Sequence, residues 1–147
     1  MNNKEYIPSI KSIRRLYTKY NRLIFKSLLP KSSDINFQIG NITIKTNYGD
    51  DVMETWAYTE VNGQEYRIKF LPKYKNIKLF ITILVHEMVH VWENEIYKKM
   101  SHGPNFFSMK EVISKHDIEL KRFYETKILC SLFFRNNECK LSCNTIF

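Results

Sequence analysis

The segment His86-Glu87-Met88-Val89-His90 constrains this chain more than any other feature. Apolar residues surround it, and their spacing predicts a long, largely buried helix over residues 76–97 with Asn76 as its N-cap. Residues four positions apart on a helix share one face, so both imidazoles can bind one metal ion. Glu87 lies one position along, where its carboxylate can accept a proton from a zinc-bound water.

His102 is the expected third ligand. The chain has four histidines, and three of them, His86, His90 and His102, fall in a stretch of 17 residues. A catalytic zinc site needs three protein ligands and one position open to water. The sequence therefore predicts a zinc ion bound by these histidines, with Glu87 as the catalytic base.

The composition indicates one domain. A chain of 147 residues with 44% hydrophobic residues can bury a real core. Its N-terminal residues lack the basic start and apolar run that are typical of a signal peptide, and no apolar run reaches about 18 residues. We therefore expect a cytoplasmic protein without a membrane span. The odd number of cysteines, Cys130, Cys139 and Cys143, argues against a disulfide framework and favours free thiols.

The net charge of +8 favours polyanions such as DNA as partners, because lysine and arginine that neutralise phosphates release counterions. The basic residues are spread along the whole chain, and a solvated basic surface explains them equally well. DNA binding is therefore one of two interpretations. We expect a monomer.

A helix and a strand are predicted before the hairpin. Apolar residues at helical spacing predict a helix over residues 8–29, ended by Pro30. Alternation over residues 35–39 predicts a half-buried strand, which Ile42 and Ile44 either extend or follow as a second strand. Residues 47–51 read as a loop. The apolar positions of the helix are Ile13, Leu16, Tyr17, Tyr20, Ile24, Phe25 and Leu28.

Asn62-Gly63 is the strongest turn signal, because a type I′ turn needs positive φ at both central residues. It predicts a hairpin with arms at residues 56–61 and 64–71, closed by Pro72. Alternation in the second arm puts Tyr66, Ile68 and Phe70 on one face.

After the long helix, residues 100–104 form a loop in which Gly103 frees the backbone beside His102. Pro104 suits the first turn of another helix, which Phe106, Phe107, Met109, Val112 and Ile113 begin. We expect a single domain over residues 1–147, with a core at about 10–125 and a tail at 126–147 that is helical in part.

With these elements in view, the chain resembles the SprT-like zinc metallopeptidases, which include the Spartan proteases, over roughly residues 16–113. The resemblance rests on the helix of residues 17–30 ending in Leu-Pro, the strand of residues 66–72, the motif of residues 86–90, and His-Gly-x-x-Phe at His102, Gly103 and Phe106. It implies a zincin-like α+β fold: an N-terminal helix, a small antiparallel sheet with a hairpin, a central His-Glu-x-x-His helix and C-terminal helices.

The resemblance also implies that His86, His90 and His102 bind zinc and that Glu87 is the base. It further implies proteolysis near nucleic acid, as in removal of proteins crosslinked to DNA. Many SprT-type proteins carry a zinc ribbon of paired Cys-x-x-Cys motifs, which this chain lacks. DNA binding would then come from the basic surface or the tail.

The expected reaction is hydrolysis of peptide bonds in a protein or peptide substrate. By residue type alone, His116, Tyr97 and Tyr124 are candidates to stabilise charge on the intermediate. A substrate could add as a strand along residues 66–71. The alternatives are a non-catalytic, zinc-stabilised module that binds nucleic acid or protein, and an enzyme that cleaves one host protein specifically.

Overall fold

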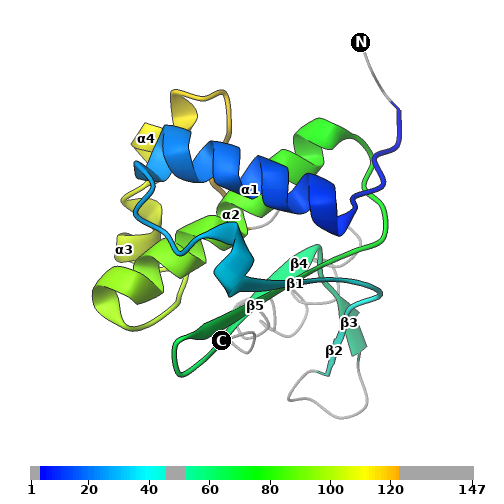
Figure 1. Ribbon diagram of the computed structural model, residues 1–147, viewed down its shortest axis with the longest axis horizontal. Coiled ribbons are helices and arrows are strands. Elements are labelled where there is room, and N and C mark those ends of the chain that lie inside the picture. The colour runs from blue at the N-terminus through cyan, green and yellow to red at the C-terminus, as the bar shows by residue number, and fades with distance from the viewer. Residues whose placement is uncertain (1–3, 46–51, 123–147) are drawn as a thin grey trace, which may run out of the picture.

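A computed structural model describes residues 4–45 and 52–122 of the chain. Two helices pack against each other on one face of a three-stranded sheet, and short helices follow them (Figure 1). The fold is α+β, as predicted. The elements in chain order are α1 (Ile10–Phe25), the 3-10 turn η1 (Ser32–Asp34), β1 (Ile35–Ile39), β2 (Thr43–Lys45), β3 (Val52–Glu54), β4 (Ala57–Asn62), β5 (Glu65–Phe70), α2 (Ile77–Tyr97), α3 (Pro104–Phe107) and α4 (Lys110–Ser114).

Helix α1 is shorter than predicted. It begins after the N-cap Ser9, whose side chain and that of Ser12 form a capping box, and it ends at Phe25. Lys26 and Ser27 then adopt left-handed backbone conformations, and the Asn21 side chain holds the turn by bonding both backbone groups of Leu29 at 3.2 Å. The predicted continuation of this helix to residue 29 was therefore wrong, and Leu28 is 69% exposed.

The three-stranded sheet has the order β1-β5-β4 and is mixed rather than purely antiparallel. β4 and β5 form the predicted hairpin, whereas β1 runs parallel to β5 with Phe37 opposite Ile68. β5 is therefore the central strand, paired along both edges. Strand addition of a substrate along residues 66–71 was a wrong prediction, because that strand has no free edge.

The hairpin turn lies one residue later than predicted. Asn62 pairs with Glu65, so the central turn residues are Gly63 and Gln64. Among these turn residues only Gly63 has positive φ, at 64°, which is typical of a type II′ turn instead of type I′. The predicted inward face is confirmed, because Tyr66, Ile68 and Phe70 are buried.

The residues after β1 form a second small sheet instead of extending that strand. Ile42 is buried, and Ile44 lies in β2, opposite Met53 of β3 in an antiparallel pair. The predicted loop at residues 47–51 lies outside the described residues.

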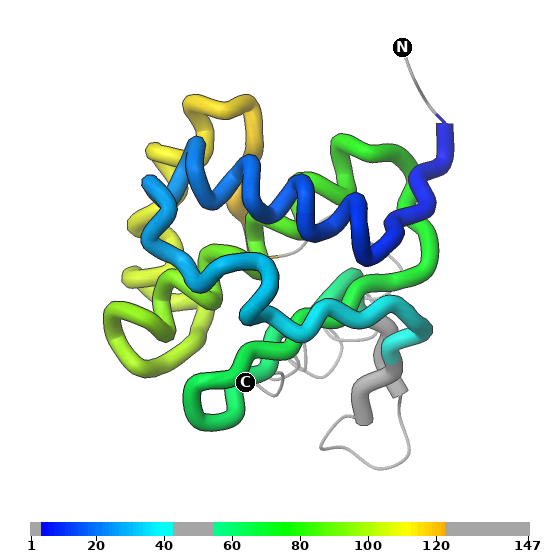
Figure 2. The backbone as a smooth tube through the Cα atoms, in the orientation of Figure 1, coloured from blue at the N-terminus to red at the C-terminus, as the bar shows by residue number. Residues whose placement is uncertain are grey.

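Helix α2 spans the molecule, as the path of the chain in Figure 2 shows. Asn76 caps its N-terminus by accepting a hydrogen bond from the Leu79 amide at 2.8 Å, as predicted. Every residue from Ile83 to Val91 is buried, so α2 is the core helix of the protein. In the described part of the chain, no helix is long and apolar enough to cross a membrane.

The segment after α2 forms two short helices, whereas one longer helix was predicted. Ser108 and Met109 separate α3 from α4. Pro104 occupies the first turn of α3, as predicted, but Gly103 has φ −96° and makes no use of glycine's conformational freedom. Phe106 and Ile113 are completely buried and attach both helices to the core. The predicted tail helix and the three cysteines lie outside the described residues.

Candidate metal centre

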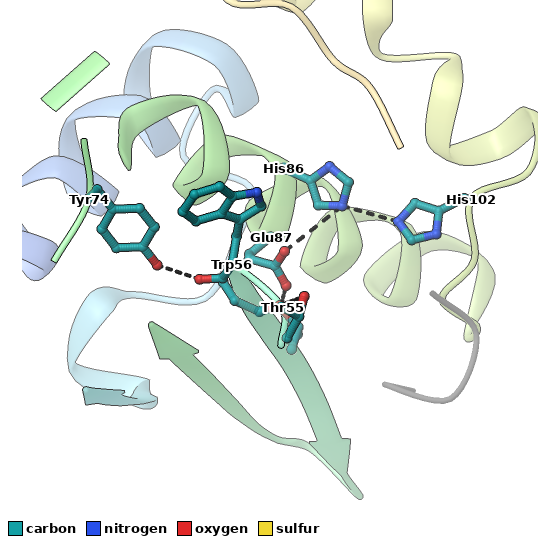
Figure 3. Close-up of polar contacts among 8 residues, drawn as sticks. Thr55, Trp56, Tyr74, His86, Glu87 and His102 are labelled. Atoms are coloured by element: carbon teal, nitrogen blue, oxygen red, sulfur yellow. Dashed lines mark hydrogen bonds and ion pairs between the residues drawn. The ribbon is translucent and has the colours of Figure 1, made fainter. Parts of the chain in front are cut away.

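The structure brings His86, His90 and His102 together, as predicted from their spacing. α2 carries His86 and His90 four residues apart, on one helix face. The chain then turns back and places His102 beside His86 (Figure 3). The Nε2 atoms of His86 and His102 are 3.1 Å apart, and one ligand nitrogen from each of the three rings lies within 4.8 Å of the others. His86 and His90 are buried, and His102 is half-buried.

This geometry fits a zinc ion. Two nitrogen ligands of tetrahedral zinc stand about 3.3 Å apart when each Zn–N bond is about 2.0–2.1 Å long. The 3.1 Å between His86 Nε2 and His102 Nε2 is close to that spacing. Three imidazoles also match the number of protein ligands that a catalytic zinc site uses.

Burial keeps the three histidines neutral, which is the form that binds metal. It lowers the pKa of His86 to about 3, against a weaker opposing effect from a hydrogen bond to the Lys121 backbone. Burial also lowers the pKa of His102 to about 2, with smaller effects from His86 and the Arg122 charge, and lowers that of His90 well below its ordinary value. One ring nitrogen of each histidine is therefore unprotonated and able to bind a metal ion at neutral pH.

Phe106 forms an apolar cover over the cluster. Its ring centroid lies 4.9 Å from that of His86, 4.7 Å from that of His90 and 4.9 Å from that of His102. Because Phe106 is completely buried, it excludes water from this side and restricts the orientation of all three rings.

Glu87 lies beside the cluster instead of completing it. Its Oε2 atom is 3.9 Å from His86 Nε2, and its Oε1 atom accepts a hydrogen bond from Thr59 Oγ1 at 2.8 Å. Burial raises the pKa of Glu87 to about 8, and the Thr59 hydrogen bond partly opposes that rise. A divalent cation next to this carboxyl would favour its ionised, basic form.

Comparison with known protein families agrees with this geometry. The model of the SprT-like family matches residues 13–127. The chain belongs to the SprT-like family. The match covers the whole histidine cluster, Glu87 and Thr59. No curated protein matches the chain.

In this SprT-like protein, Thr59 is the functional candidate that the sequence analysis missed. It lies 28 residues before Glu87, and only the packing of β4 against α2 brings the two together. One signal was available: Thr59 is a polar residue at an inward position of the alternating strand, and it is completely buried.

Of the three candidates for stabilising charge, the two in the described part of the chain, Tyr97 and His116, do not contact the histidine cluster. Tyr97, at the end of α2, is 45% exposed and packs against Trp92. His116 lies in the turn after α4, where its amide donates to the Ile113 carbonyl. Tyr124 is outside the described residues. Arg122 is near enough to the cluster for its charge to lower the pKa of His102.

Proposed function

We propose that this SprT-like protein is a zinc-dependent metallopeptidase. The observation that carries the proposal is the buried Glu87 carboxyl beside three converging imidazoles. A purely structural zinc site usually has four protein ligands rich in cysteine and gains little from a carboxyl beside an open position.

The zinc site, Glu87 and Thr59 have different roles in the proposed hydrolysis. A bound zinc ion supplies Lewis acidity toward a peptide carbonyl and toward a water molecule. Glu87 accepts a proton from the attacking water and passes it to the leaving amine. Thr59 holds Oε1, which leaves Oε2 on the side of the histidines.

An extended substrate would lie along β4. In the described part of the sheet, β4 pairs with β5 on one side only, and it carries Thr59 next to Glu87. A peptide that adds to this edge would bind mainly through backbone hydrogen bonds. Weak preference for particular side chains follows.

The test is cleavage of an unfolded protein substrate by the wild type, Glu87→Gln and His90→Ala, with zinc content measured on the same samples. We expect Glu87→Gln to keep about one zinc per chain and lose cleavage, and His90→Ala to lose both. Glu111→Gln on the exposed face of α4 is the matched control and should cut normally. Undiminished cleavage by Glu87→Gln would refute the proposal, and zinc without cleavage in the wild type would favour a binding module.

We also propose that the exposed face of α1 binds polyanions such as DNA. Lys11, Arg15, Lys19 and Arg22 lie on that face at spacings of four, four and three residues, and α1 contains no acidic residue. Such a stripe can follow a phosphate backbone and release counterions.

Replacing Lys11 and Arg15 with alanine should weaken binding of single-stranded DNA and reduce the salt dependence by about one unit of slope per lost contact. The matched control is the double change Lys110→Ala and Lys115→Ala in and just after α4, which also removes two exposed cations. Equal effects of the two pairs would mean that total charge matters and that α1 is not a specific surface.

A further inference from the structure

Glu93 is a buried acidic residue that the proposed reaction does not use. It is 0% exposed and lies three residues after His90 on α2. Since residues 86, 90 and 93 recur at spacings of four and three, Glu93 shares a helix face with the two histidines. One face of α2 therefore presents two metal ligands and then a carboxyl group.

Both oxygens of Glu93 bind the residue that precedes the third ligand. Oε1 accepts a hydrogen bond from the Ser101 amide at 2.7 Å, and Oε2 accepts one from Ser101 Oγ at 3.0 Å. Ser101 Oγ in turn accepts a hydrogen bond from the Gly103 amide at 3.1 Å. The residues on both sides of His102 are thus tied, directly or through one atom, to the helix that carries His86 and His90.

The contact of Gly103 with Ser101 explains why a glycine suits this position. A Cβ atom at residue 103 would lie 3.3 Å from Ser101 Oγ, closer than most such contacts. Gly103 has an ordinary negative φ, so backbone strain does not require it. The absence of a side chain allows the Ser101 hydroxyl to sit between the Glu93 carboxyl and the Gly103 amide.

Burying a carboxyl group destabilises a protein unless hydrogen bonds compensate for the lost water. Both oxygens of Glu93 accept their hydrogen bonds from a single loop residue, Ser101. We propose that Glu93 is a positioning residue: through Ser101, it holds the loop so that His102 meets the other two ligands. The proposal rests on the metal site described above, but not on peptide hydrolysis. Groups that orient metal ligands typically change metal affinity about 10- to 100-fold when removed.

Zinc affinity is the direct test, measured by competition with a chromogenic chelator. Ser101→Ala and Glu93→Ala should raise the zinc dissociation constant about 10- to 100-fold, and Glu93→Gln, which keeps an oxygen and the shape, should raise it less. Cobalt-substituted Ser101→Ala should show weaker visible absorption than the wild type, because an unanchored His102 leaves the tetrahedral geometry. The double variant should lose less than the sum of both single losses.

Asn21→Ala is the matched control, since Asn21 also uses a buried side chain to hold one loop residue, Leu29, far along the chain from the metal ligands. It should lower the melting temperature without changing the zinc dissociation constant. Wild-type zinc affinity and an unchanged cobalt spectrum in Ser101→Ala and Glu93→Ala would overturn the proposal. If His102→Ala also left zinc affinity unchanged, the assignment of the third ligand itself would fail. If the wild type binds zinc but cuts nothing, only the proposed function fails.

Discussion

The side chain of Glu87 is balanced between two opposing effects. Burial raises its pKa, whereas the hydrogen bond from Thr59 favours the charged form. Hydrogen bonds to charged groups contribute about 1.5–3 kcal/mol, and each 1.4 kcal/mol or so is a factor of ten in rate. In the proposed reaction, Thr59 therefore supports Glu87 as the base, through a hydrogen bond to its carboxyl group.

Thr59→Val tests that role at nearly constant volume. We expect kcat to fall about 10- to 100-fold while zinc content stays unchanged, because the carboxyl loses its fixed orientation and its only described side-chain donor. Parallel kinetics and metal analysis check this. A variant that loses zinc together with activity would show that Thr59 supports the fold instead of the base.

Glu87 also gives the metal-free protein a defined pH dependence. Its pKa is raised from 4.5 to about 8, so its contribution to stability is present below 4.5 and is lost as the pH rises through 8. The histidines act in the opposite direction: the pKa of His86 is lowered from 6.5 to about 3, so stability is lost as the pH falls below 6.5.

Glu87→Gln should therefore flatten the loss of stability between pH 4.5 and 8 in the presence of a chelator. The difference from the wild type should be on the order of a few kcal/mol, because each unit of pKa shift corresponds to about 1.4 kcal/mol. Urea unfolding at both ends of this range measures it. Parallel curves for the two proteins would mean that Glu87 titrates normally.

At the scale of elements, the hairpin turn depends on one glycine. Gly63 has a φ of 64°, which is strained for any residue with a side chain. Gly63→Ala should lower the free energy of unfolding by about 1–2 kcal/mol. Gly40→Ala is the control, since Gly40 has no positive φ and a Cβ there meets only the flexible end of Lys69. Denaturant unfolding of both variants decides the point, and equal losses would contradict it.

The predictions from sequence succeeded where a repeating pattern defines an element. Helical spacing and the Asn76 cap predicted α2, and alternation predicted the buried face of β5. The end of α1 was not predicted correctly, because the apolar spacing continues to Leu28. The turn is set instead by the left-handed backbone at Lys26 and by the hydrogen bond between Asn21 and Leu29. Local patterns cannot show that β1 runs parallel to β5, and that pairing is what closes the edge of β5.

The candidate site was predictable to the extent that it is local. His86, His90 and His102 lie within 17 residues, so their spacing was enough to group them. Thr59 comes from a different element, and no short-range spacing connects it to Glu87. Glu93 is also close in sequence, but an acidic residue on a helix ordinarily faces solvent, so its burial was not foreseeable.

At the scale of the molecule, metal binding should stabilise the whole fold, because the ligands sit on the core helix and on the loop that follows it. Zinc at a thousand times its dissociation constant adds about 4 kcal/mol, which for a chain of this size raises the melting temperature by roughly 10 °C. Thermal unfolding with added zinc or chelator measures this shift. His90→Ala should abolish it and His116→Ala should keep it; a shift that survives His90→Ala would place the metal elsewhere.

The proposed chemistry depends on one residue that is distant in sequence from the metal site. The three histidines, Glu87 and the Glu93 contact lie between residues 86 and 102, whereas Thr59, the hydrogen-bond partner of Glu87, comes from the hairpin. Substitutions in the strand could therefore remove peptide cleavage during evolution while zinc binding is kept. Such a descendant would retain all three histidines and still bind zinc in an assay. Among such proteins, the residue at position 59 would distinguish active from inactive enzymes better than the histidines do.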